Sequence, residues 1–194
     1  MSDKPISRFP VPDINDVPED IKAVILEVQE QTGFVPNVFF ALARRPAEFR
    51  AFFGYHNALM EKESGLTLGE REMVIVVTSS INECIYCVVA HGAILRIREK
   101  NSLIADQIAT NYRKADITPR QRAMLDFAAK VTNRSCNVDD ADYDVLHAHG
   151  FTDEDIWDIA ALASLYGFSN RMANSLSIRP NDEFYLMGRV PKQR

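Results

Sequence analysis

The sequence lacks any long apolar run. None of its 194 residues falls in a stretch that approaches the roughly 20 consecutive apolar residues of a membrane-spanning helix. The first 20 residues carry prolines and acids and contain no apolar segment of signal-peptide length. We therefore expect a cytoplasmic protein that does not enter a membrane.

Basic residues and cysteines are also scarce. The chain has 22 Lys and Arg against 27 Asp and Glu, a formal net charge of −5, and no basic block that would attract a phosphate backbone. We therefore expect no nucleic-acid partner. Three cysteines cannot all pair within one chain, and structural disulfides are rare in the cytoplasm. The cysteines must be explained by other chemistry.

Hydrophobic residues make up 46% of the chain, which is enough to form a sizeable core. The proline-rich residues 1–17 predict an extended N-terminal arm. Residues 18–177 are expected to form a single all-helical domain, with a motif core at about 66–100. Residues 178–194 are expected to form a C-terminal tail that packs outside this domain or against a neighbouring subunit.

Start and stop signals predict helices throughout the domain, and no segment alternates with period two. Thr67, followed three residues later by Glu70, is a capping-box signature for a helix over about 68–82. Its β-branched interior, Met73–Val77, would suit a strand by propensity alone, but the cap and the length of the run favour a helix. The fold class is therefore all-α, a compact multi-helix bundle. The other expected helices run from Pro18, capped by Asp16, to Gly33, and over 38–43, 46–65, 84–100, 102–111, 119–133, 140–150 and 153–175.

One pattern occurs twice. Leu66-Thr67-x-x-Glu70-Arg71-x-Met73 resembles Ile117-Thr118-x-x-Gln121-Arg122-x-Met124 at an offset of 51 residues. Either the domain consists of two related helical halves, or two helices simply begin with similar caps. The sequence leaves both explanations open.

Cys84, Cys87 and His91 are spaced to lie along one stripe of a helix. Cys84 would lie in the first turn, where free backbone N–H groups and the helix dipole favour the thiolate. Cys87 would have His91 one turn further on as a proton partner. A peroxide-cleaving thiol needs this combination, because a thiolate attacks the O–O bond, a proton reaches the departing oxygen, and a second thiol condenses with the sulfenic acid.

Glu72 precedes a very apolar stretch, so we expect its carboxylate to be held partly away from water. It could then relay protons to His91 if the two helices pack side by side. Together these residues form the pattern Glu-x11-Cys-x2-Cys-x3-His. The pattern resembles the alkylhydroperoxidase D family, within the carboxymuconolactone decarboxylase-like superfamily, and especially its peroxidase-related subgroup. The resemblance is strong over residues 66–98 and weaker at 150–153 and 170–174.

The resemblance implies a role for each of these residues. Cys87 would be the peroxidatic cysteine and Cys84 the resolving cysteine, more open to an external reductant. His91 and Glu72 would form the proton relay. The best-known members carry a histidine directly before the second cysteine, whereas this sequence has Tyr86. We expect Tyr86 to pack, with a hydrogen bond at the site as the alternative.

The resemblance also implies what the protein binds. The partners would be a hydroperoxide substrate and an unidentified dithiol or protein reductant, with no metal, flavin or haem required. The family's helical subunits form homo-oligomers, so a dimer, trimer or hexamer is implied.

Three other functions stay open. The first is a thiol–disulfide exchange adapter or redox sensor that consumes little peroxide. The second is a decarboxylase-like or lactone-acting enzyme, as in other parts of the superfamily. The third is a non-enzymatic protein that binds zinc through Cys84, Cys87, His91 and Glu72.

The remaining candidate residues have no motif around them. We expect Trp157 and the aromatic group at 39–55 to build core, although that group could also wall a pocket for an organic peroxide. His56, His147 and His149 are expected at the surface or in packing roles. Cys136 receives no function.

Overall fold

In the computed structural model, residues 4–189 are described and form ten α-helices, two short 3₁₀ turns and no strand, which confirms the all-α class. No helix in this range has the length and apolarity required to cross a bilayer. The helices are α1 (Glu19–Thr32), α2 (Asn37–Ala43), α3 (Pro46–Met60), α4 (Leu68–Ile81), α5 (Ile85–Arg98), α6 (Ile104–Asn111), α7 (Pro119–Arg134), α8 (Asp140–Ala148), α9 (Asp153–Ser175) and α10 (Glu183–Leu186). The 3₁₀ turns are η1 (Tyr112–Lys114) and η2 (Ser135–Asn137).

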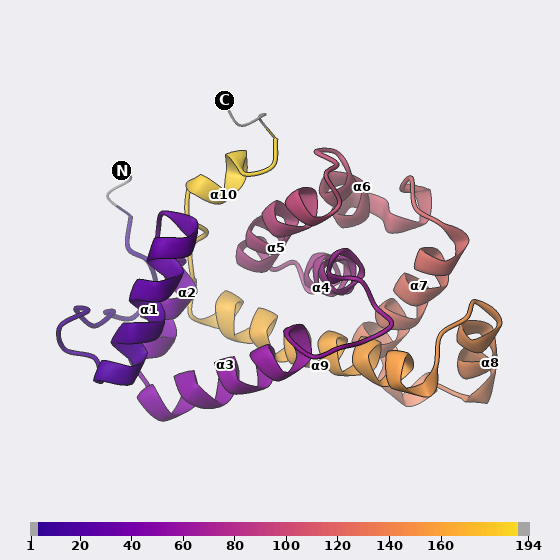
Figure 1. The fold of residues 1–194 in the computed structure, drawn as a ribbon, viewed down its shortest axis with the longest axis horizontal. Helices are drawn as coiled ribbons and strands as arrows, with labels where there is room; N and C mark the ends of the chain where they lie inside the picture. The colour runs from indigo at the N-terminus through magenta and orange to yellow at the C-terminus, as the bar shows by residue number, and fades with distance from the viewer. Residues whose placement is uncertain (1–3, 190–194) are drawn as a thin grey trace.

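Helix α4 lies at the centre of the bundle. Figure 1 views it along its axis, with α5, α6, α7 and α9 around it. All of its residues from Gly69 to Ser79 are buried. A helix that is apolar on nearly every side is stable when other helices surround it. Tertiary packing therefore keeps the β-branched run Met73–Val77 helical despite its propensity for strand.

Capping boxes begin both helices of the repeated pattern. The Thr67 hydroxyl accepts a hydrogen bond from the Glu70 backbone N–H at 3.1 Å, and the Glu70 carboxylate accepts one from the Thr67 N–H at 3.0 Å. Thr118 and Gln121 form the same box at the start of α7. Both predicted caps are confirmed, and the duplication of a helical half stays a prediction.

The start of α1 differs from the sequence prediction, whereas its end agrees with it. Pro18 is the N-cap residue of α1, and no side chain caps this helix, so the predicted Asp16 cap is wrong. Asp16 lies in the preceding turn, where its backbone N–H donates to the Asp13 carbonyl. Gly33 ends this helix in the left-handed conformation at φ 87°, as predicted.

Helix α3 ends at Met60 and does not reach the predicted Gly65. The chain leaves the helix there and crosses to α9. Lys62 and Ser64 both bind the buried Asp158 carboxylate, at 2.5 and 2.7 Å. These bonds give the connection to α4 a defined path.

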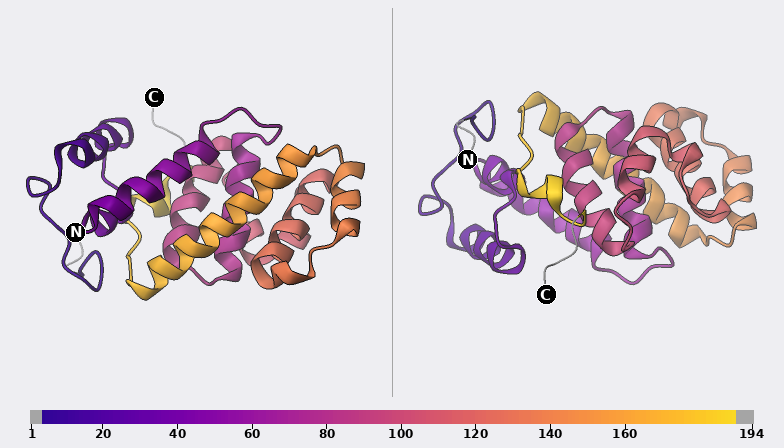
Figure 2. Two further views of the ribbon diagram at one scale, coloured as in Figure 1. Left: turned by 90° about the horizontal axis from the view of Figure 1, so that it is seen from below. Right: turned by 90° about the horizontal axis from the view of Figure 1, so that it is seen from above.

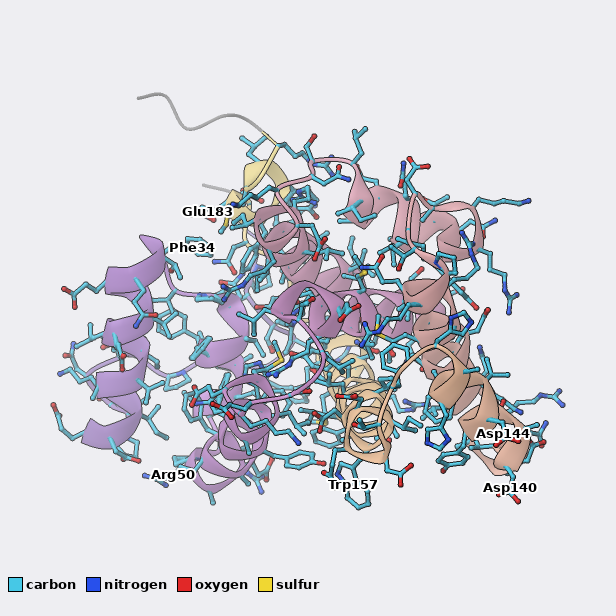
Figure 3. All side chains as sticks on the ribbon, turned by 45° about the vertical axis from the view of Figure 1, so that its right-hand side comes forward. Phe34, Arg50, Asp140, Asp144, Trp157 and Glu183 are labelled. Carbon is cyan, nitrogen blue, oxygen red and sulfur yellow. The ribbon has the colours of Figure 1, made fainter. Side chains whose placement is uncertain are left out.

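The aromatic residues divide between core and surface. Phe39, Phe49 and Phe53 stack together in a cluster formed by α1, α2 and α3, as predicted. Tyr55 is 49% exposed and Trp157 is 71% exposed, so their predicted place in the core is wrong. Trp157 lies on the outer face of α9 and points away from the bundle in Figure 3.

The C-terminal segment folds back onto the bundle. Ile178 and Phe184 are buried, and α10 packs against α5. The predicted packing of the tail outside the domain is therefore wrong for residues 178–189, because its apolar side chains bury against α5, while 190–194 lie outside the described residues. Figure 2 shows this yellow segment between the N-terminal helices and α5. The domain boundaries themselves stay a prediction.

Candidate active site

Helices α4 and α5 pack side by side and bring Glu72 against His91. The Nδ1 atom of His91 lies 2.8 Å from Oε2 of Glu72. The Glu72 side chain is 4% exposed and that of His91 15%. Glu72 is thus held away from water, as expected, and the contact that sequence alone could not establish is present. A buried carboxylate can hold and orient an imidazole that exchanges protons.

Cys84 is the N-cap residue of α5. Its Sγ accepts a hydrogen bond from the Cys87 backbone N–H at 3.5 Å. Glu83 before it has φ 52°, in the left-handed region, and the Cys84 N–H donates to the Ser79 carbonyl at 2.9 Å. This turn directs the Cys84 sulfur to the positive end of the helix dipole, one position before the predicted first turn.

The two thiols differ in how readily they lose a proton. Hydrogen bonds from the Cys87 thiol and backbone lower the pKa of Cys84 to about 7. The same thiol–thiol contact, together with burial, raises the pKa of Cys87. The favoured form of the reduced pair therefore has a thiolate at Cys84 and a thiol at Cys87.

Both cysteines are buried. Cys84 is 0% exposed and Cys87 2%, so neither thiol is open in this conformation, and the greater access of a reductant to Cys84 stays a prediction. They belong to an apolar cluster that also contains Ala173 of α9 and Phe184 of α10, with Phe34 packed against it. In Figure 3 Phe34 lies next to Glu183, where the loop between α1 and α2 meets the C-terminal segment over α5.

Hydrogen bonds hold these two segments together. We call residues 34–38 and 178–187 the cover of the thiols. Asn181 accepts from the Asn37 N–H at 2.7 Å and donates to the Val35 carbonyl at 2.9 Å, while the Asn37 side chain donates to the Arg179 carbonyl at 2.8 Å. Two segments more than 140 residues apart in sequence thus form one layer.

Tyr86 attaches this cover to α5. Its hydroxyl accepts a hydrogen bond from the Val38 backbone N–H at 3.3 Å, and its side chain is buried. Burial raises the pKa of Tyr86, which keeps the phenol neutral. Tyr86 therefore packs, as expected, and its recorded hydrogen bond is to α2.

The other candidates lie elsewhere. Cys136 is exposed in η2. A hollow of about 970 Å³ lies along α7 and α8, and none of the predicted site residues lines it. Residues 4–189 contain no group of three or more His, Cys, Asp or Glu side chains placed to hold a metal ion.

The comparisons with known proteins agree with this arrangement. Residues 46–110 match the carboxymuconolactone decarboxylase family. The chain is 66% identical to the alkylhydroperoxidase AhpD core structure of an uncharacterized peroxidase-related protein from Ralstonia eutropha JMP134. That alignment covers 97% of this chain and 100% of the other, with a TM-score of 0.96.

The chain belongs to the alkylhydroperoxidase D-like (AhpD-like) group of the carboxymuconolactone decarboxylase superfamily.

Two further structures extend this result. This AhpD-like chain is 40% identical to an uncharacterized peroxidase-related protein from Silicibacter sp. TM1040, with 97% and 100% of the two chains covered and a TM-score of 0.92. The debrominase Bmp8 shares the fold at 20% identity, with 94% and 95% covered and a TM-score of 0.77. Curated proteins yield no match.

Sequence reasoning missed the role of Asn170 in this AhpD-like site. Asn170 is fully buried on α9, donates to the Ser79 hydroxyl at 2.9 Å and accepts from the Asn82 side chain at 3.0 Å. It thereby fixes the turn that precedes Cys84. The available signal was a polar residue on an otherwise apolar face of α9.

Three more residues near the site were not predicted. The Ser169 hydroxyl lies 3.9 Å from the Cys87 sulfur. The buried ring of Tyr166 meets the His91 ring edge-on, with centroids 4.7 Å apart, and the His56 ring lies 6.5 Å from Tyr166. Burial lowers the pKa of His56, so its neutral form is favoured. No local motif marked these residues, because they come from α3 and α9 and not from the helix of the cysteines.

Proposed function

We propose that this AhpD-like chain is a cysteine-dependent peroxidase that reduces hydrogen peroxide or an alkyl hydroperoxide. The observation that carries the proposal is the buried Glu72–His91 pair, which joins the central helix α4 to α5, the helix of Cys84, Cys87 and His91. Attack on an O–O bond requires a thiolate, a proton source and a second thiol, and these four residues offer all three.

The first step oxidises Cys87. Its proton passes to the Cys84 thiolate, a base whose pKa of about 7 suits neutral pH. The Cys87 sulfur attacks the terminal oxygen of the peroxide as this proton leaves, so an S–O bond forms and the O–O bond breaks without a free Cys87 thiolate. The sulfur becomes a sulfenic acid, and the departing oxygen takes a proton from solvent through the His91–Glu72 pair and leaves as an alcohol or water.

The second step forms the disulfide. The Cys84 sulfur attacks the sulfenic acid of Cys87, an S–S bond forms, and the hydroxyl group leaves with the Cys84 proton as water. An external dithiol then reduces the disulfide and is itself oxidised to a disulfide. This last step requires the cover to move, because both sulfurs lie beneath it.

The relatives support this proposal over the alternatives. Two close relatives are described as peroxidase-related, whereas Bmp8 is a debrominase at 20% identity, a likeness that concerns the fold. An exchange adapter without peroxidase turnover remains the second candidate, favoured by the low pKa of Cys84. A decarboxylase-like activity would not need either cysteine.

The proposal is tested by counting free thiols after addition of hydrogen peroxide or tert-butyl hydroperoxide. The protein and its Cys84→Ser and Cys87→Ser variants are compared in a Cys136→Ser background, which removes the exposed thiol. We expect rapid loss of two thiols in the parent. When Cys84 is replaced, we expect a trappable sulfenic acid on Cys87 that forms more slowly, because the base that takes the Cys87 proton is gone. Thiols that survive peroxide but exchange with a disulfide donor would indicate the adapter instead.

A further inference from the structure

A small, partly open cavity lies between α2, α3, α5 and α9, and reaches the neighbourhood of Cys87 through Ser169. It has a volume of about 40 Å³. Its wall is predominantly apolar, and the aliphatic and phenyl side chains that form it are Val38, Leu42, Phe52, Phe168, Met172, Ala173 and Ile178.

The cavity wall has one polar group on the side of the thiols, the Ser169 hydroxyl. Tyr86 also lines the cavity, but its hydroxyl is bound to the Val38 N–H, and Glu48 at the outer side pairs with Arg45 at 2.9 Å. Ser169 is the third polar residue of the wall, and its Oγ lies 3.9 Å from the Cys87 sulfur. The cavity is thus apolar except where it approaches the reactive sulfur.

A second, wider hollow leads towards the cavity from the surface. It measures about 340 Å³ and extends along Phe9, Arg44 and Leu176. Leu42, Glu48 and Met172 line both spaces; Glu48 is exposed, whereas Leu42 and Met172 are half-buried. These two half-buried side chains therefore stand between the outer hollow and the inner cavity, and methionine adapts its shape readily.

The cavity can accept only a compact group. A water molecule needs about 10–15 Å³ by the same measure, so about 40 Å³ holds about three groups of that size. A branched group of about four carbons reaches the upper limit of this space. A phenyl-bearing or long-chain group exceeds it unless side chains move.

We propose that this cavity receives the organic group of the hydroperoxide, and that Leu42 and Met172 limit its size. The inference rests on the proposed peroxidase function, because it places the O–O bond at Cys87. A hydroperoxide has an apolar carbon group at one end and a polar oxygen pair at the other. The cavity offers apolar walls to the first and the Ser169 hydroxyl to the second.

The test compares kcat/KM for tert-butyl hydroperoxide, cumene hydroperoxide and hydrogen peroxide in the full-length protein. Each organic rate is expressed relative to hydrogen peroxide, so that partial loss of folded protein cancels. Leu42→Phe fills the cavity and is expected to lower the tert-butyl ratio about tenfold or more. Met172→Ala enlarges it and is expected to raise the cumene ratio by a similar factor. Leu103→Phe is the matched control, because Leu103 is exposed and lines neither space.

The outcomes separate this inference from the proposed function. If no peroxide oxidises Cys87 in the parent, the peroxidase function fails and the pocket with it. If the parent reduces peroxides but both ratios in Leu42→Phe and Met172→Ala equal those of Leu103→Phe, the function stands and the pocket assignment is overturned. Opposite changes in the two variants support it. Thermal unfolding of each variant checks that it is folded.

Discussion

The imidazole of His91 lies 2.8 Å from the carboxylate of Glu72, across the contact between the central helix and the helix of the cysteines. The described chain contains a second pair with the same separation, His147 and Asp153. There the side chains are 45% and 88% exposed, against 15% and 4% at the site. An imidazole–carboxylate pair therefore occurs once in a buried setting and once at the surface. The exposed pair is an internal control for the buried one.

Replacing Glu72 with Gln is expected to slow peroxide-dependent disulfide formation by about 100-fold, the scale of a lost proton-transfer group. The amide keeps the shape but cannot hold a proton for His91. Stopped-flow measurement of thiol loss would show the change. Asp153→Asn, which alters the exposed pair, is expected to leave the rate as it was. Equal rates in Glu72→Gln and the parent would remove Glu72 from the relay.

The rate of thiol oxidation is expected to rise as pH increases from about 6 to about 8. The pKa of Cys84 is lowered to about 7, so the Cys84 thiolate is lost as pH falls below that value. An unperturbed thiol would titrate about 1.5 pH units higher. Oxidation rates measured across this range in the Cys136→Ser background give the midpoint. A midpoint near 8.5 would contradict the assigned effect of the Cys87 hydrogen bonds.

Loosening the cover is expected to expose the thiols. Asn181→Ala removes two hydrogen bonds that join residues 35–37 to the C-terminal segment. We expect the thiols to react several-fold faster with a bulky aromatic disulfide. Asn133→Ala, which removes one side-chain bond within α7, is the control and should match the parent. If Asn181→Ala and Asn133→Ala react alike, movement of the cover does not limit access.

Asn170→Ala is expected to lower the free energy of unfolding by about 2 kcal/mol, because it removes the hydrogen bond to the buried Ser79 hydroxyl and one of the two bonds made by the Asn82 side chain. Urea unfolding of the reduced protein measures this. Asn174→Ala also removes a bond to the turn, to the Asn82 carbonyl, but from an exposed position, and should cost less. A loss of stability no larger in Asn170→Ala than in Asn174→Ala would contradict the role assigned to Asn170.

Much of the fold could be predicted because its signals are local. The capping boxes at Thr67 and Thr118 depend on residues three apart, and Cys87 and His91 share a face because both lie on one regular helix. These patterns are written in short stretches of sequence. The starts of these two helices, and the position of Cys87 and His91 on one stripe, could therefore be predicted from the sequence.

The rest depends on contacts between distant segments. Nothing near Asn181 in sequence indicates that it binds residues 35–37, and nothing near Ser169 indicates a thiol. Trp157 was placed in the core because most apolar residues of long helices are buried, but it lies on the outer face of α9. Such features arise only when the helices pack, so a single sequence carries little trace of them.

The cover also has a consequence for the order of synthesis. Cys84 and Cys87 leave the ribosome about 100 residues before the segment at 178–187 that buries them. At about 5 to 20 residues per second, this interval lasts about 5 to 20 seconds. During that time the growing chain carries both thiols without the C-terminal half of their cover, and they can meet oxidants and partners from which the finished protein shields them.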